Sequence, residues 1–204
     1  MARAALRQFE VTGWLHLDHG SSINLIQHCL DAGFDSVMID ASEKSFEENV
    51  KITKEVVDMA AGYKANVEAE LGYVAKLGQR QEVDRFTQPE EAKRFVEETG
   101  VHALAIAVGS AHGFYKQPPK LQIDLIGRIH AATKAALVLH GSSGIPDDQL
   151  KVAIANGIAK VNLATETKNT FMKALRTILH DNDEIDLRQV FPEATREVVE
   201  LIEN

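Results

Sequence analysis

Short apolar runs alternate with amphipathic segments along the whole chain. Runs of four to eight mostly apolar residues bounded by turn residues are typical of buried strands, and a 3.6-residue spacing of apolar positions is typical of helices. The predicted strands are residues 14–18, 36–40, 65–70, 103–109, 136–140 and 159–164. The predicted helices are residues 4–9, 21–32, 45–61, one that begins at 88–91, 121–133, 146–155, 166–179 and 193–202.

The order of these elements predicts an α/β fold made of six strand–helix units. The strands are apolar on both faces, as in a parallel sheet that is covered or closed. A TIM (β/α)₈ barrel takes about 250 residues, roughly 31 per unit, so 204 residues hold about six and a half units. We therefore expect residues 1–204 to form a single barrel domain with about six of its eight units. An open doubly wound sheet is the alternative, but it gathers ligand residues at one switch point, whereas here they end nearly every strand.

Three histidines each close a short apolar run and are followed at once by glycine. They are His19, His112 and His140. Because the carboxyl ends of parallel strands meet at one face of a barrel, these imidazoles can approach one another. Three neutral imidazoles with an open fourth position form a catalytic zinc site. The pattern therefore predicts a Zn²⁺ centre.

Asp18 directly precedes the first of these histidines. By strand alternation Asp18 shares a face with His16, and His19 lies at the strand end. A carboxylate beside a metal-bound histidine can act as a general acid and base. The alternative is that Asp18 caps the following helix or orients a ring. His16 is expected to pack or to orient a neighbour rather than to bind metal.

Two loops rich in glycine and hydroxyl groups follow the last two predicted strands. Their backbone N–H groups can hold a phosphate, and barrels often bind phosphate at these two places. An ordinary turn between strand and helix is the alternative. The candidate residues are Gly141, Ser142, Ser143, Asn162 and Thr165.

Three carboxylates also lie at or near the ends of two other strands. Asp40 and Glu70 are candidates for a second divalent or monovalent cation, and Glu68 is the weaker candidate. Helix capping or pairing with lysine is the alternative. Because Glu68 and Glu70 share a face, a half-buried pair of this kind needs partners.

Charge and composition limit the partners. A formal net charge of −8 argues against nucleic acid and anionic membranes, and no apolar stretch approaches the roughly 20 residues of a membrane span. Cys29 is the single cysteine, which fits a reducing cytoplasm. The amphipathic segment Met1–Phe9 is expected to be part of an ordinary helix, with a mitochondrial leader as the alternative.

At six places the chain resembles the class II, zinc-dependent ketose-bisphosphate aldolases, the family that includes fructose- and tagatose-bisphosphate aldolases. The order and spacing of the matching runs agree across essentially the whole chain. The runs are Leu15–Gly20, Gly33–Asp40, Val67–Gly72, Gly109–Gly113, Leu137–Gly141 and Lys160–Thr165.

The resemblance implies a TIM barrel that binds zinc through His19, His112 and His140, with Asp18 as the proton donor. It places a phosphorylated sugar on the two phosphate loops and implies a homo-oligomer, a dimer or a tetramer. Asp40 and Glu70 match positions that can hold a second metal. The contacts to dihydroxyacetone phosphate would come from Gly113, Gly141 through Ser143, and Asn162 through Thr165.

Two departures from the family pattern stand out. The family carries two more strand–helix units before the first strand predicted here, so the chain is expected to be N-terminally truncated. Relatives often have a Gly-Gly-x-Glu-Asp loop after the third strand, whose acid assists the enolate step. Here that loop is Tyr73–Gln79, with Lys76 within it and Glu82 as the nearest later acid. Lys76 can meet an anionic substrate or simply be solvated.

The expected activity is the reversible cleavage of a ketose (bis)phosphate to dihydroxyacetone phosphate and an aldehyde. The departure in the Tyr73–Gln79 loop puts the usual bisphosphate substrate in doubt. Two alternatives stay open: an inactive truncated fragment, and a metal-dependent hydrolase or isomerase on the same barrel.

Overall fold

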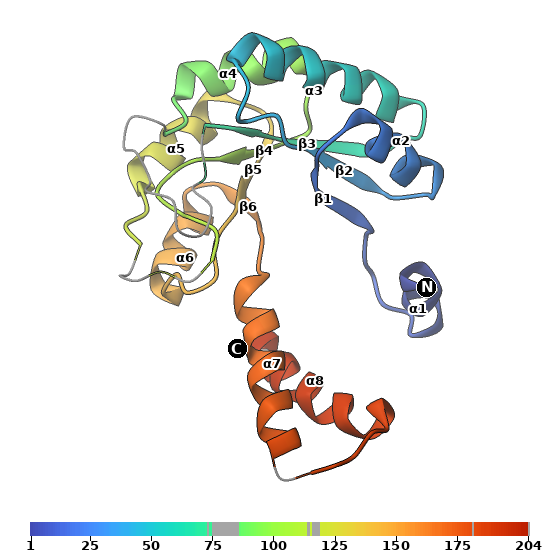
Figure 1. Ribbon diagram of the computed structural model, residues 1–204. Coiled ribbons are helices and arrows are strands. Elements are labelled where there is room, and N and C mark those ends of the chain that lie inside the picture. The colour runs from blue at the N-terminus through green and yellow to red at the C-terminus, as the bar shows by residue number, and fades with distance from the viewer. Residues whose placement is uncertain (73, 75–85, 114, 116–118, 181, 204) are drawn as a thin grey trace.

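The computed structural model describes residues 1–72, 74, 86–113, 115, 119–180 and 182–203, and within them six strands alternate with helices (Figure 1). The strands are β1 (His16–Gly20), β2 (Ser36–Ile39), β3 (Asn66–Leu71), β4 (Ala103–Ile106), β5 (Ala136–Leu139) and β6 (Ile158–Val161). The helices are α1 (Ala2–Gln8), α2 (Ile23–Asp31), α3 (Phe46–Ala61), α4 (Pro89–Thr99), α5 (Ile123–Ala132), α6 (Asp147–Ala155), α7 (Thr165–His180) and α8 (Leu187–Glu203).

The described strands form one parallel sheet in sequence order, from β1 to β6. Each strand pairs with the next one along the chain, so every connection is a strand–helix–strand crossover. The sheet curves into a half-barrel, with helices on its outer side (Figure 1). The predicted α/β class and the six parallel strands are therefore confirmed, and β1 and β6 are the two edges of the described sheet.

The main core lies between the sheet and the outer helices. Its members are large aliphatic side chains of alternate strand positions together with the inner faces of the helices, among them Ile26, Val67, Phe95, Leu104, Ile126 and Leu137. Local signals fix where the helices begin: Ser45 and Glu48 form the capping box of α3, and Pro89 opens α4. Burial of these apolar faces holds the strands in order and therefore positions their carboxyl ends.

The inner face of the sheet is different in character. Met38, Ala105 and Val138 form a small separate apolar cluster there, and the buried carboxylates Glu68 and Glu70 are each only 2% exposed. Buried charge is costly unless it is paired, so the interior of this half-barrel depends on polar contacts more than on packing.

The helical hairpin of α7 and α8 projects from the sheet, and the two helices pack mainly on each other (Figure 1). Phe171 and Phe191 meet edge to face, with ring centroids 5.4 Å apart. Helix α8 begins at Leu187 rather than at residue 193, because Asp186 accepts a hydrogen bond from the Arg188 N–H at 3.0 Å and starts the helix before Pro192. None of the described helices is long and apolar enough to cross a membrane.

Several strand boundaries also differ from the prediction, and two of them are informative. Strand β1 begins at His16, two residues later than predicted, and Trp14 is 74% exposed. Strand β4 ends at Ile106, although its apolar run continues to residue 108. The buried residues beyond it belong to a loop that carries His112. The apolar run marks burial at β4 but not at β1, where it includes the exposed Trp14, and in neither case does it fix where strand pairing begins or ends.

Candidate metal centre

The end of β1 departs from regular strand geometry. The pairing of β1 with β2 shifts register between Leu17 and Gly20, and His19 adopts a φ of 49°, in the left-handed region. An irregularity of this kind turns successive side chains toward the same side of a sheet. Asp18 consequently meets Asn162 at 3.0 Å, while the neighbouring His19 meets His140 at 3.0 Å.

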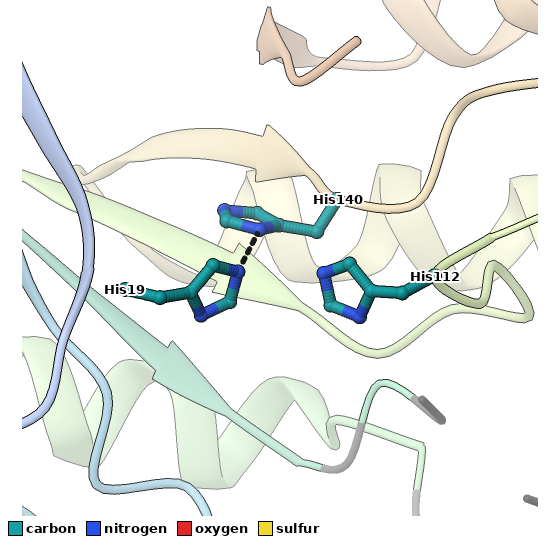
Figure 2. Close-up of side chains that lie close together, drawn as sticks. All are labelled: His19, His112 and His140. Carbon is teal, nitrogen blue, oxygen red and sulfur yellow. Dashed lines mark hydrogen bonds between the residues drawn. The ribbon is translucent and has the colours of Figure 1, made fainter. Parts of the chain in front are cut away.

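The structure brings the three predicted histidines together. His19 comes from β1, His112 from the loop after β4, and His140 directly follows β5, and Figure 2 shows their rings turned toward one another. The ring centroids are 4.8–5.8 Å apart. One nitrogen of each ring lies within 4.8 Å of the others, as a shared metal ion requires.

Hydrogen bonds to carboxylates set the orientation of two of these rings. His19 Nδ1 lies 3.0 Å from Asp40 Oδ2, and His140 Nε2 lies 2.8 Å from Glu68 Oε1. The hydrogen bond with His19 holds the pKa of Asp40 below its usual range. Burial alone raises the pKa of Glu68, but its hydrogen bond with His140 and the Lys160 ammonium lower it overall. Both carboxylates are therefore ionised, and each accepts the N–H of its histidine.

This arrangement leaves two lone pairs facing each other. With His19 Nδ1 and His140 Nε2 as donors, the remaining nitrogens are His19 Nε2 and His140 Nδ1, which lie 3.0 Å apart (Figure 2). Each is then a hydrogen-bond acceptor in the neutral ring. Two acceptors at this distance repel unless a proton or a metal ion lies between them. The hydrogen bond to Asp40 also raises the pKa of His19, so the metal-free site favours such a shared proton.

His112 completes the set. Both of its ring nitrogens are buried and have no hydrogen-bond partner among the described residues. Burial lowers the pKa of His112, which keeps the ring neutral. Unpartnered buried polar atoms cost free energy, and a metal ion bound at one of these nitrogens would supply one of the two missing partners. Three neutral imidazoles with oriented lone pairs therefore fit zinc.

A second candidate cation site adjoins the first. His19, Asp40 and Glu70 offer ligand atoms within 4.8 Å of one another. Glu70 Oε2 is buried without a described partner. Burial, followed by the nearby Asp40 carboxylate, raises the pKa of Glu70 to about 8. Both oxygens of Asp40 already have hydrogen-bond partners, His19 and Ser42, whereas Glu70 Oε2 has none among the described residues.

We expect Glu70 to make the stability of the metal-free chain fall as the pH rises. Its folded-state pKa of about 8 exceeds its ordinary value of 4.5, so the folded chain binds the extra proton and loses stability between these pH values. Glu70→Gln should remove this contribution and raise the free energy of unfolding by roughly 2–5 kcal/mol above pH 8, with little change near pH 4.5. Urea unfolding across this pH range, with chelator present, measures the difference. Glu97 is exposed, so Glu97→Gln is the control and should show the wild-type dependence of unfolding free energy on pH. The same dependence in Glu70→Gln as in wild type would contradict the expectation.

A tyrosine that the sequence did not single out joins the loops of two histidines. Tyr115 Oη accepts a hydrogen bond from the Ala111 N–H at 2.7 Å and donates one to the Gly141 carbonyl at 2.6 Å. The loops are so close at Gly141 that a Cβ there would lie 2.4 Å from the Ala111 carbonyl oxygen. Gly141 also has a φ of +66°, which favours glycine. The spacing of His112 and His140 therefore depends on this contact.

The two predicted phosphate loops lie side by side. Ser142 Oγ donates to the Asn162 carbonyl, and Ser143 Oγ accepts from the Glu166 N–H at 3.2 Å. Glu166 in turn accepts from the Gly144 N–H at 3.3 Å. These contacts join the loops at the N-terminus of α7, where backbone N–H groups favour an anion.

The remaining predicted residues lie around these loops with different exposure. Ser142 and Ser143 are buried, whereas Leu163 is 46% exposed and Ala164 is exposed. Gly113 follows His112 directly, with a φ of +98°. A cleft of about 570 Å³ opens beside the histidines and has room for a small substrate; it is lined by His19, Ser21, Asp40, Ala41, Glu43, Lys44 and His112.

Sequence reasoning found the ligand candidates but not all of their partners. The sequence ranked Glu68 below Glu70 as a metal ligand and gave no sign that Lys160 would be its partner. In the structure the Lys160 ammonium donates a hydrogen bond to Glu68 Oε2 at 2.7 Å, and the other oxygen of Glu68 contacts His140. The signal in the sequence was Glu68 itself, because a charged residue inside an apolar strand needs a buried partner. His16 bonds Ser36 Oγ at 2.8 Å, as expected of an orienting residue. Lys76 and Glu82 lie outside the described residues.

Comparison with known proteins bears on this site. A family model described as fructose-bisphosphate aldolase class-II matches residues 1–204. A fructose-bisphosphate aldolase of Staphylococcus epidermidis is 44% identical over 193 residues, which cover 92% of this chain and 67% of the relative. One from Staphylococcus aureus is 46% identical over 175 residues, covering 84% and 60%.

A solved structure gives the same result. The YdjI aldolase of Escherichia coli K12 superposes with a TM-score of 0.83 at 37% identity, over 98% of this chain and 72% of that one. The chain thus spans about two thirds of the length of these relatives. The family model matches the whole chain, and the strands are arranged as in a solved aldolase. The chain therefore belongs to the class II fructose-bisphosphate aldolase family, whose named members are lyases.

Proposed function

We propose that this chain catalyses the zinc-dependent, reversible aldol cleavage of a ketose phosphate or bisphosphate to dihydroxyacetone phosphate and an aldehyde. Family membership supports the reaction class. The observation that supports the zinc requirement is the convergence of His19, His112 and His140. The lone pairs of His19 and His140 face each other, and neither ring nitrogen of His112 has a partner among the described residues.

In this proposal His19, His112 and His140 hold one zinc ion. When bound, zinc supplies Lewis-acid chemistry that polarises the substrate carbonyl and stabilises the negative charge left by carbon–carbon cleavage. The carboxylates Asp40 and Glu68 keep two of the rings in the orientation that points a lone pair into the site. Glu70, with Asp40, is proposed as the place of a second cation.

Asp18 is proposed to move the proton. It would take the proton of the substrate hydroxyl whose carbon becomes the aldehyde, and return it in the condensation direction. Asn162 donates a hydrogen bond to Asp18 Oδ1 at 3.0 Å, which fixes the carboxylate and leaves Oδ2 for the substrate. The irregular end of β1 places Asp18 beside His19, so proton transfer and metal binding occur at one point.

The phosphate is proposed to lie on the joined loops after β5 and β6. A chain with a net charge of −8 needs local N–H groups to attract an anion. Gly141 through Ser143 and Asn162 through Thr165 bring such groups to the N-terminus of α7. Gly113, next to His112, is proposed as a further contact.

A product assay on a panel of ketose phosphates tests this function. We expect the zinc-loaded chain to release dihydroxyacetone phosphate and an aldehyde in equal amounts. Release of inorganic phosphate would indicate a hydrolase, and appearance of an aldose phosphate without carbon–carbon cleavage would indicate an isomerase. Either result without release of dihydroxyacetone phosphate would refute the proposal, as would a folded, zinc-loaded chain that cleaves no ketose phosphate.

A further inference from the structure

Glu68 lies at the centre of a polar network that is separate from the ligand nitrogens. The residue is 2% exposed in the middle of β3, yet both of its carboxylate oxygens have partners. Oε1 lies 2.8 Å from His140 Nε2, and Oε2 lies 2.7 Å from Lys160 Nζ. Charge-assisted hydrogen bonds of this length are strong and directional.

The network reaches across the inner face of the half-barrel. Lys160 on β6 lies 3.5 Å from His16 Nε2 on β1, and His16 Nε2 lies 3.6 Å from Glu68 Oε2. His16 is held in turn by Ser36 on β2. The two edge strands of the described sheet therefore meet at Glu68 through side chains, and each oxygen of this carboxylate has a fixed partner.

These contacts decide which nitrogen His140 presents to the site. While Glu68 Oε1 accepts the N–H of Nε2, the lone pair of the neutral ring lies on Nδ1, which faces His19 Nε2 at 3.0 Å. Lys160 binds the other oxygen, so the carboxylate cannot rotate away without breaking its ion pair and leaving the buried Glu68 charge without that partner. Neither Glu68 nor Lys160 needs to touch metal or substrate for this effect.

We propose that Glu68, held by Lys160 and His16, is a positioning residue that fixes the orientation of His140 for metal binding; this inference rests on the proposed zinc site. The amide of Glu68→Gln tests it, because an amide carries both a donor and an acceptor. The Lys160 ammonium can only donate hydrogen bonds, so it attracts the oxygen of the new side-chain amide. The NH₂ group of that amide must then face His140 Nε2. The ring proton then shifts to Nδ1 and points into the site.

We expect Glu68→Gln to lower zinc affinity about 10- to 100-fold, measured by competition with a chelator of known affinity. Adding Lys160→Met removes the ammonium and frees the amide oxygen to face His140. The double variant should therefore regain most of the affinity that Glu68→Gln loses. If Glu68 only stabilised the fold, the second substitution would remove a further stabilising contact and would not restore zinc affinity.

Controls separate this inference from the zinc site itself. Thermal melting establishes that each variant is folded, and nitrogen NMR of His140 reports which ring nitrogen carries the proton in the metal-free protein. Glu98→Gln, which breaks an exposed ion pair with Arg94 in α4, should leave zinc affinity unchanged. If wild type binds no zinc, the proposed function fails. If wild type binds zinc and folded Glu68→Gln binds it equally well with an unchanged His140 tautomer, the positioning role is wrong.

Discussion

Asp18→Asn is expected to lower kcat for aldol cleavage by about 10²- to 10⁴-fold, the range typical of losing a positioned general acid or base. An amide has nearly the shape of the carboxylate and still accepts the hydrogen bond from Asn162, but it cannot take up a proton near neutral pH. Because Asp18 is not one of the three converging ligands, we expect the variant to bind one zinc per chain and to keep KM close to that of wild type.

Parallel measurement of kcat, KM and bound zinc tests this assignment. Asp58→Asn removes a carboxylate that is exposed on α3 and is the matched control; it should behave as wild type. A folded Asp18→Asn chain with wild-type kcat would show that the proton moves through another group. Loss of zinc in this variant would instead indicate that Asp18 belongs to the metal shell.

His112→Leu is expected to have two opposite effects. It removes a ligand and should abolish stoichiometric zinc binding and, with it, aldol activity. In the metal-free protein it replaces an imidazole whose two nitrogens are buried without described partners by an apolar side chain of similar size. Relief of this cost should raise the free energy of unfolding by roughly 1–3 kcal/mol, as measured by urea unfolding with chelator present.

His102→Leu provides the contrast. His102 Nδ1 accepts a hydrogen bond from the Val67 N–H at 3.1 Å, so its loss should destabilise the chain and leave zinc binding intact. The two substitutions are chemically the same, but the His102 residue is exposed and its ring has a partner, whereas the ring nitrogens of His112 are buried and have none among the described residues. Retention of one tightly bound zinc by His112→Leu would overturn the ligand set.

The predictions from sequence held best where a feature depends on nearby residues. Apolar runs and turn residues gave six parallel strands in the right order, because burial on both faces leaves a local pattern. The histidines could be grouped for the same reason: each ends a strand, and parallel strands end on one side. The capping box at Ser45 and Glu48 is equally local and was found.

What the sequence did not reveal depends on residues far apart in the chain. Glu68 and Lys160 are 92 positions apart, and His19 and Asp40 are 21 apart, so no spacing rule joins them. Alternation along β1 correctly grouped His16 with Asp18 but gave no sign of the left-handed backbone at His19. That conformation depends on pairing with β2, where a side chain at Gly20 would collide with the Met38 carbonyl oxygen at 2.5 Å.

The central claim is that three histidines form one zinc centre on which aldol cleavage depends. The most direct measurement strips the purified chain of metal with a chelator, then follows dihydroxyacetone phosphate production as zinc is returned in known amounts. The account predicts no detectable cleavage without metal, and activity that rises linearly and levels off at one zinc per chain for the site of His19, His112 and His140. Full cleavage activity in the metal-free chain would contradict it.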